Sequence, residues 1–200
     1  MPSYEAFARF YDAVQGDRSE ALPFVLPHLS GARTVLELAR QKLPGVELVL
    51  GDMTTIRLGR TFDTVLCLYD AVNHLLEFED WERLFDTAAA HLRPGGVFVF
   101  DMNSRERLEW FVGRPAVALD FGDANVAVID VADGGGRIIN WELRFFEQLE
   151  GDRYRLTRET IREAAFPEPQ VRAALETRFA SVAVEEESGR VWFACRTRAG

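Results

Sequence analysis

The chain has 200 residues, of which 48% are hydrophobic and 12% aromatic, so it can bury a substantial core and is expected to form a single globular domain. Its formal net charge of -9 argues against nucleic acid as a partner, because nucleic-acid binding draws its affinity from Lys and Arg side chains that neutralise phosphates. It contains no apolar run near the roughly 20 residues of a membrane-spanning helix and no apolar signal-peptide region, so we expect a cytoplasmic protein without membrane contact.

The first part of the chain predicts two helices followed by short buried strands. Apolar residues at spacings of three and four predict an amphipathic helix over 4–14, and a second short helix is expected over 20–28. Four short apolar runs then predict strands, over 34–39, 46–50, 64–68 and 97–100. Apolar residues at consecutive positions are typical of strands covered on both faces, as in parallel sheets.

A helix is predicted between the last two of these strands. Asp80 is a suitable N-cap, and apolar residues from Trp81 to Leu92 follow at helical spacing, before a break at Arg93-Pro94-Gly95-Gly96. A strand, a helix and a strand joined by a right-handed crossover make the two strands parallel. We therefore predict an α/β fold, with a Rossmann-like, doubly wound and mostly parallel sheet.

The pattern changes after Asn103. Three partly alternating segments predict an antiparallel meander, over 126–131, 137–149 and 153–164. The run Gly134-Gly135-Gly136 is interpreted as a turn within this meander, because a phosphate-binding glycine loop opens a helix and here a strand follows.

The chain closes with a predicted helix near 168–177 and an antiparallel hairpin of 181–185 and 190–196. The predicted organisation is one domain over 1–200, in which 115–165 form an antiparallel β insertion that acts as a lid.

The sequence offers little support for metal or hydrolytic chemistry. Cys67 and Cys195 each lie in an apolar run and are expected to be reduced core residues. His28, His74 and His91 are scattered without metal-ligand spacing, so no metal site is expected. The motifs of serine hydrolases, zinc proteases and P-loop proteins are missing, as is an intact dinucleotide fingerprint.

Polar side chains follow three of the predicted strands. They are Asp52 after the second strand, Asp70 and Asn73 after the third, and Asp101 and Asn103 after the fourth. Open α/β sheets bind ligands in the crevice beyond the carboxyl ends of their strands. The sequence therefore predicts a ligand site at this edge of the sheet.

Six motifs together resemble one known family, the class I S-adenosylmethionine-dependent methyltransferases, and in particular a bacterial small-molecule subgroup with an antiparallel insertion before the last helix. They are Tyr11-Asp12 and residues 35–39, 51–53, 62–63, 70–74 and 92–98. The resemblance covers nearly the whole chain. Its most specific part is the Leu-Arg-Pro-Gly-Gly turn at 92–96, followed by an apolar strand.

The resemblance implies S-adenosylmethionine as the cofactor and a small molecule as the substrate. The implied cofactor contacts are Tyr11, Glu37, Ala39, Asp52, Met53, Leu68, Tyr69 and Asp70. The implied substrate contacts are Asn73, His74, Trp141 and Arg144. Methyl transfer from a sulfonium is an in-line displacement that depends mainly on near-attack geometry and exclusion of water, so a catalytic base is not required in every case. Where the acceptor must lose a proton, Asp70 and His74 are the candidate catalytic residues.

The chain departs from the family between Ala39 and Val46. Members of the family have a glycine-rich turn, a helix, a second strand that ends in a ribose-binding acid, and a further helix at this point, so roughly thirty residues are missing relative to a full βαβ unit. Six connecting residues span at most about 20 Å, whereas a parallel crossover needs a dozen or more residues. A hairpin or a rearranged edge must replace the crossover if the two strands are directly joined. Two explanations stay open: a true deletion, or a segment that belongs between Ala39 and Arg40.

We therefore predict an S-adenosylmethionine-dependent methyltransferase of a small-molecule acceptor, working as a monomer or homodimer. Two alternatives stay open. One is a degenerate methyltransferase fold that serves as a non-catalytic binding or scaffold module, as the missing glycine-rich turn suggests. The other is a Rossmann-type enzyme with a nicotinamide cofactor. The acceptor atom and the oligomeric state are left open by the sequence.

Overall fold

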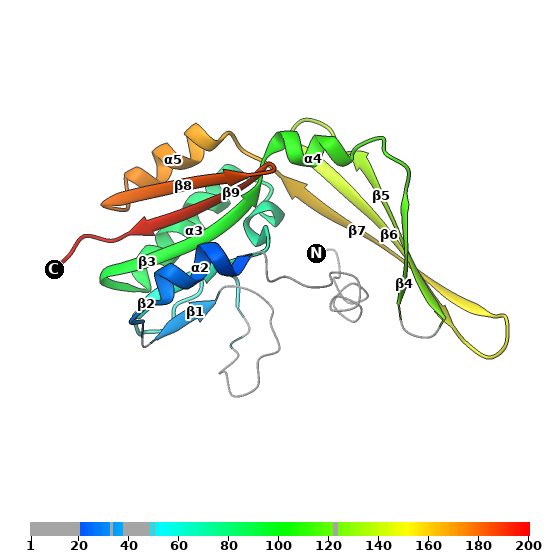
Figure 1. Cartoon of the computed structure of the whole chain (residues 1–200), viewed down its shortest axis with the longest axis horizontal. Coiled ribbons are helices and arrows are strands. Elements are labelled where there is room, and N and C mark those ends of the chain that lie inside the picture. Colours follow the sequence, from blue (N-terminus) through cyan, green and yellow to red (C-terminus); the bar gives the residue numbers. More distant parts are fainter. Residues whose placement is uncertain (1–20, 33, 38–48, 50, 122–123) are drawn as a thin grey trace.

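Two β-sheets, flanked by helices, make up the molecule (Figure 1). The computed structural model describes residues 21–32, 34–37, 49, 51–121 and 124–200. The predicted helix over 4–14 lies outside these residues, as do Ala39 and, apart from Val49, the predicted strand over 46–50. Val49 is exposed and belongs to no strand.

The first sheet has the strand order β1-β2-β3-β9-β8. Its strands are β1 (Val35–Glu37), β2 (Phe62–Cys67), β3 (Leu92–Asn103), β8 (Ser181–Glu187) and β9 (Arg190–Arg196). β1, β2 and β3 are parallel, whereas β9 is antiparallel to both β3 and β8. This arrangement confirms the predicted Rossmann-like sheet with a closing antiparallel hairpin.

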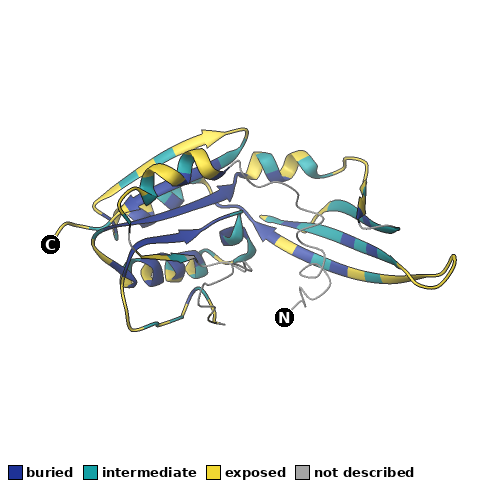
Figure 2. Ribbon diagram, turned by 60° about the horizontal axis from the view of Figure 1, so that its bottom comes forward, coloured by how far each residue is buried: buried dark blue, intermediate teal, exposed yellow. Residues whose placement is uncertain are grey.

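Helices cover both faces of the first sheet. Helix α2 (Leu22–Leu29) packs on one face, where Val25 joins a buried cluster with Val99 of β3 and Trp192 of β9. Helices α3 (Phe78–Ala90) and α5 (Glu168–Glu176) pack on the other face, over a larger apolar core. Cover on both sides is the reason why the central strands are apolar at consecutive positions, and Figure 2 shows these strands as buried along most of their length.

β1 lies directly beside β2 although the usual crossover is missing from the sequence. Thr34 donates both its backbone N–H and its hydroxyl to Asp63 Oδ2, each at 2.8 Å. The backbone N–H of Asp63 donates in return to the Thr34 hydroxyl at 3.1 Å. These hydrogen bonds join the amino ends of the two strands, so β1 keeps a parallel position next to β2.

The second sheet is antiparallel and extends away from the first (Figure 1). Its strands follow in chain order as β4 (Val117–Phe121), β5 (Asn125–Asp133), β6 (Ile138–Gln148) and β7 (Tyr154–Ala164). The glycine run is a turn, as predicted: Gly135 and Gly136 have φ values of 87° and 64°, and Ile138 donates to the Gly135 carbonyl at 3.1 Å.

The sequence missed some elements and placed two boundaries wrongly. Asp80 was predicted as an N-cap, but α3 begins at Phe78, with Glu77 in the N-cap position. Helix α4 (Arg105–Phe111), strand β4 and the short 3-10 helix η2 (Ala71–His74) were not predicted. Residues 92–96 were expected to form a turn between the helix and the strand, yet they are the first residues of β3. Phe62 pairs with Leu92, and the N–H of Phe62 donates to the His91 carbonyl. Both cysteines are free thiols in the core, as expected. Among the described residues, no helix has the length and hydropathy needed to cross a membrane.

Candidate active site

A strained turn lies at the carboxyl end of β2. Tyr69 and Asp70 both have left-handed backbone conformations, with φ values of 61° and 54°, which are uncommon for residues other than glycine. Asp101, at the end of the neighbouring β3, holds this turn. Its Oδ1 accepts from the Tyr69 N–H at 2.6 Å and its Oδ2 from the Asp70 N–H at 3.0 Å. Backbone in such a conformation persists only where its surroundings over-determine it, and these conformations concentrate at functional sites.

An ion-pair network links the turn to the closing hairpin. Arg190 of β9 donates to Asp101 Oδ2 at 2.8 Å and to Asp70 Oδ1 at 3.3 Å. Asp101 is fully buried. Burial and the nearby charge of Asp70 raise the pKa of Asp101 to about 7, while Arg190 and the two backbone N–H groups act in the opposite direction. Arg190 therefore supplies the positive charge that allows two acids to lie side by side at this strand end.

Asn73 joins the two sheets. Its side chain is completely buried; Nδ2 donates to the carbonyls of Asn103 and Ala164 at 3.1 and 2.9 Å, and Oδ1 accepts from the Asn103 N–H at 2.9 Å. One amide group thus ties η2 to the end of β3 and to the end of β7. This places the last residues of β7 against the strand-end turn.

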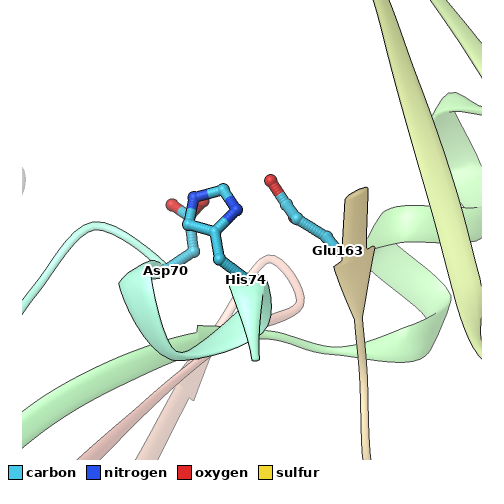
Figure 3. A group of neighbouring side chains, drawn as sticks. All are labelled: Asp70, His74 and Glu163. Atoms are coloured by element: carbon cyan, nitrogen blue, oxygen red, sulfur yellow. The ribbon is translucent and has the colours of Figure 1, made fainter. Parts of the chain in front are cut away.

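Glu163 is brought into the site by this junction. It lies next to Ala164 on β7 and is only 5% exposed. Asp70, His74 and Glu163 each offer a ligand atom, and these atoms all lie within 4.8 Å of one another; Figure 3 shows the three side chains converging from the two sides of the junction. The Asn103 amide donates to Glu163 Oε2 at 3.4 Å. Burial, followed by the charge of Asp70, raises the pKa of Glu163 well above its ordinary range.

His74 completes the group as a neutral imidazole. Burial lowers its pKa, although a hydrogen bond with the backbone of Arg162 partly offsets that effect. The group therefore combines two carboxylates, a neutral histidine and the nearby Arg190. The carboxylate oxygens and the imidazole nitrogen favour a cationic ligand, either a metal ion or an ammonium group.

Comparison with known proteins gives this site a family context. Residues 31–96 match a family model described as "Methyltransferase domain". Over 67 residues the chain is 39% identical to a dTDP-3-amino-3,4,6-trideoxy-alpha-D-glucopyranose N,N-dimethyltransferase of Streptomyces venezuelae, and the match covers 34% of this chain and 28% of that protein. Another 67-residue match, 34% identical, is to a dTDP-3-amino-3,6-dideoxy-alpha-D-glucopyranose N,N-dimethyltransferase of Streptomyces fradiae and covers 26% of it. The matches thus span about a quarter of the length of these relatives.

Similarity to solved structures extends over nearly the whole chain. A methyltransferase structure from Clostridium acetobutylicum, described as S-adenosylmethionine-dependent, has a TM-score of 0.76 at 19% identity, covering 98% of this chain and 99% of that one. A structure of an amino pentose methyltransferase from Micromonospora echinaspora, with bound S-adenosylmethionine, has a TM-score of 0.76 at 24% identity over 97% of both chains. The chain has the class I methyltransferase fold.

Within this methyltransferase fold, several of the predicted cofactor residues meet at one edge of the sheet. Glu37 ends β1 and pairs with Leu66, so the carboxyl ends of β1, β2 and β3 lie together. The pKa of the exposed Asp52 is lowered by hydrogen bonds from the hydroxyl and the N–H of Thr54, at 2.7 and 2.8 Å. Asp52 is therefore ionised at neutral pH.

The other predicted cofactor contacts differ in burial. Met53 is half-buried and packs on the core that α3 and α5 cover, whereas Leu68 is buried in the cluster beneath α2. Tyr69 is half-buried, and its backbone is held by Asp101. Tyr11 and Ala39 lie outside the described residues.

The four residues predicted to contact the substrate do not lie together in the structure. His74 lies in the acidic group with Asp70 and Glu163, and Asn73 uses its amide on backbone groups at the junction. Trp141 pairs with Ile161, faces the same side of the sheet as Glu163 and packs against Phe111, with ring centroids 5.1 Å apart. Arg144 lies on the opposite face, because side chains alternate along a strand, and there it borders a surface pocket with Asp130, Glu142 and Arg158.

Two residues of the site were missed by the sequence reasoning. Arg190 follows the Ser188-Gly189 turn and carries no motif. Glu163 could have been noticed, because it lies two positions after Ile161 and so on the same face of β7, and a buried acid beside an apolar residue is unusual. Asp101 and Asn103 were recognised as polar strand-end residues but were not assigned to a contact.

Proposed function

We propose that this chain is an S-adenosylmethionine-dependent methyltransferase that acts on a small molecule. The observation that carries the proposal is the left-handed turn of Tyr69 and Asp70, clamped by Asp101 at the carboxyl edge of the methyltransferase-type sheet. Ligands of open α/β folds bind at this edge.

The residues at this edge fit S-adenosylmethionine, which supplies a methyl group on a positively charged sulfur. We propose that the cofactor is held by the end of β1 at Glu37, by the loop of Asp52 and Met53, and by residues 68–70, with Tyr11 and Ala39 as further contacts. The partly exposed carboxylate of Asp70 is suited to the positive charge of a sulfonium. The turn itself is rigidly held, so it can position a bound group and limit the access of water.

We infer that the acceptor is an amino group of a small molecule and that the second sheet covers it. The named relatives are N,N-dimethyltransferases of nucleotide-linked amino sugars, which supports an amine. Placement of Glu163 and Trp141 on one face of the second sheet supports residues 115–165 as a lid within a single domain. His74 and Asp70 stay candidate catalytic residues, because both lie where this lid meets the first sheet.

We further propose that the protein works in the cytoplasm as a monomer or homodimer, without nucleic-acid or membrane partners. The net charge of -9 argues against nucleic acid as a partner, and the two free, buried thiols suit a reducing compartment.

Isothermal titration calorimetry with S-adenosylmethionine and its demethylated product tests the proposal. Wild-type protein should bind both. Asp52→Asn should bind several-fold more weakly, because it removes the charge of an exposed carboxylate in the cofactor loop. Asp133→Asn is a matched control, since Asp133 also accepts the N–H of the residue two positions later, at 2.8 Å, but in the glycine turn of the second sheet. If no heat of binding is detected at millimolar cofactor, the proposed enzymatic activity is refuted. The alternative, a non-catalytic module of the same fold, would then stand.

A further inference from the structure

The junction between the two sheets forms an acidic site whose ligand has not been assigned. Asp70 and His74 come from the first sheet's strand-end turn and η2, while Glu163 comes from the last residues of β7. Figure 3 shows the three side chains directed toward a common space. Glu163 is nine-tenths or more buried, so its charge cannot be satisfied by bulk water.

Acidic groups outnumber basic groups at this junction. Arg190 is paired with both Asp101 and Asp70, at 2.8 and 3.3 Å, and Glu163 adds a third carboxylate nearby. The groups that face Glu163 are Asp70, the neutral His74, the Asn103 and Trp141 side chains, and Arg190. One guanidinium therefore serves three acids, and the pKa values of Asp101 and Glu163 are raised. A cationic ligand would stabilise the ionised forms of these acids.

Hydrogen-bonding capacity at the junction also matches an ammonium. Asn103 is 5% exposed, and within the described part of the chain its Oδ1 accepts no hydrogen bond, although its Nδ2 donates to Glu163. An alkylammonium carries up to three N–H donors. Oxygens of Asp70, Glu163 and Asn103 can accept them.

We propose that Asp70 and Glu163 bind the protonated amino group of the acceptor and that Glu163 takes the proton which the nitrogen must lose before methyl transfer. This rests on the proposed function and adds the residues that recognise and activate the acceptor. The proton passes from the ammonium nitrogen to a Glu163 oxygen, which frees the nitrogen lone pair. That lone pair forms the new N–C bond to the methyl carbon while the C–S bond breaks, and the bonding electrons stay on sulfur as a neutral thioether.

Burial suits Glu163 to this step. A carboxylate in water is a weak base toward an ammonium, whereas the desolvation that raises the pKa of Glu163 brings the two groups closer in basicity. The neighbouring Asp70 remains paired with Arg190 and supplies attraction for the cation.

The test compares Glu163→Gln with Glu159→Gln, a matched control on the same strand and face, four positions earlier and likewise buried. The probe is dTDP-3-amino-3,6-dideoxy-α-D-glucopyranose, and its analogue with a 3-hydroxyl group is the comparison ligand. Wild type and Glu159→Gln should bind the amine roughly 10-fold or more tightly than the hydroxyl analogue, and Glu163→Gln should lose that preference. The kcat/KM of Glu163→Gln should fall roughly 100-fold or more and recover as pH rises, because the amine then loses its proton to solvent.

Two controls separate this proposal from the proposed function. Calorimetry should show unchanged S-adenosylmethionine binding in Glu163→Gln, so failure of the wild type to bind the cofactor would refute the methyltransferase and not the amine site. Equal binding of amine and hydroxyl ligands by the wild type overturns the amine site, as does a wild-type pH profile in Glu163→Gln. A stoichiometric, chelator-sensitive divalent metal that is lost in Glu163→Gln also overturns it.

Discussion

Replacing Asn73 with Ala should destabilise the protein strongly. The buried amide makes three hydrogen bonds, all to backbone groups of β3 and β7. A buried hydrogen bond contributes about 1 kcal/mol net, and a buried partner left without one costs about 1–3 kcal/mol. We therefore expect Asn73→Ala to lower the free energy of unfolding by about 3–5 kcal/mol, a large fraction of the roughly 5–15 kcal/mol that stabilises a typical protein.

Urea unfolding at 25 °C followed by circular dichroism measures this effect. With a slope of about 2 kcal/mol per molar urea, the midpoint should fall by about 2 M. Asn140→Ala is the control, because Asn140 is a half-buried residue of β6 whose buried Oδ1 accepts no hydrogen bond within the described residues. It should cost less than about 1 kcal/mol. If Asn73→Ala unfolds at the wild-type midpoint and instead raises KM, Asn73 faces the substrate, as the family resemblance implied, and the junction argument is wrong.

Two further changes test the clamp and the hairpin. The pKa of Asp101 in the folded protein, about 7, lies above its ordinary value of 3.8. The wild type should therefore lose up to about 4 kcal/mol of stability relative to Asp101→Asn as pH rises from about 4 to about 7. Unfolding free energies of the two proteins that change in parallel with pH would contradict this. Gly189→Ala should cost about 2–4 kcal/mol, because Gly189 has a φ of 75° and an added Cβ would lie 2.8 Å from Arg107 Cβ. Gly151→Ala, at a φ of 63° with nothing within 4 Å, should cost only about 1 kcal/mol; equal melting temperatures of the two variants would refute the packing contribution.

The first sheet was predictable because its residues obey local rules. Strands covered on both faces are apolar at consecutive positions, and the amphipathic helix α3 has one apolar face, so both patterns can be recognised without knowing any contact. Helix α4 and strand β4 lack such a pattern. Trp110 of α4 and Val117 of β4 are more than half exposed, so burial imposes no regular polarity on these elements.

The position of β1 shows where sequence reasoning about chain reach was incomplete. The six residues after Ala39 are too few for a crossover helix in the connection that follows β1. The reach of that connection does not decide where the strand itself lies. Hydrogen bonds between Thr34 and Asp63, together with three residue pairs to β2, hold β1 in parallel register from its amino end. Local contacts therefore keep the strand in place whatever the length of the connection at its carboxyl end.

The acceptor side of the site depends on contacts that no local pattern contains. Glu163 meets Asp70 and His74 because Asn73 binds the Ala164 carbonyl, across 91 positions of sequence. The family model matches residues 31–96, which include the strand-end turn but not β7. The family-model match therefore bears on the half of the site proposed for the cofactor, whereas the second sheet supplies the group proposed to select the acceptor. We therefore expect changes in β6 and β7 to affect the acceptor more than the cofactor, so the amine inferred from the relatives has to be tested on this chain.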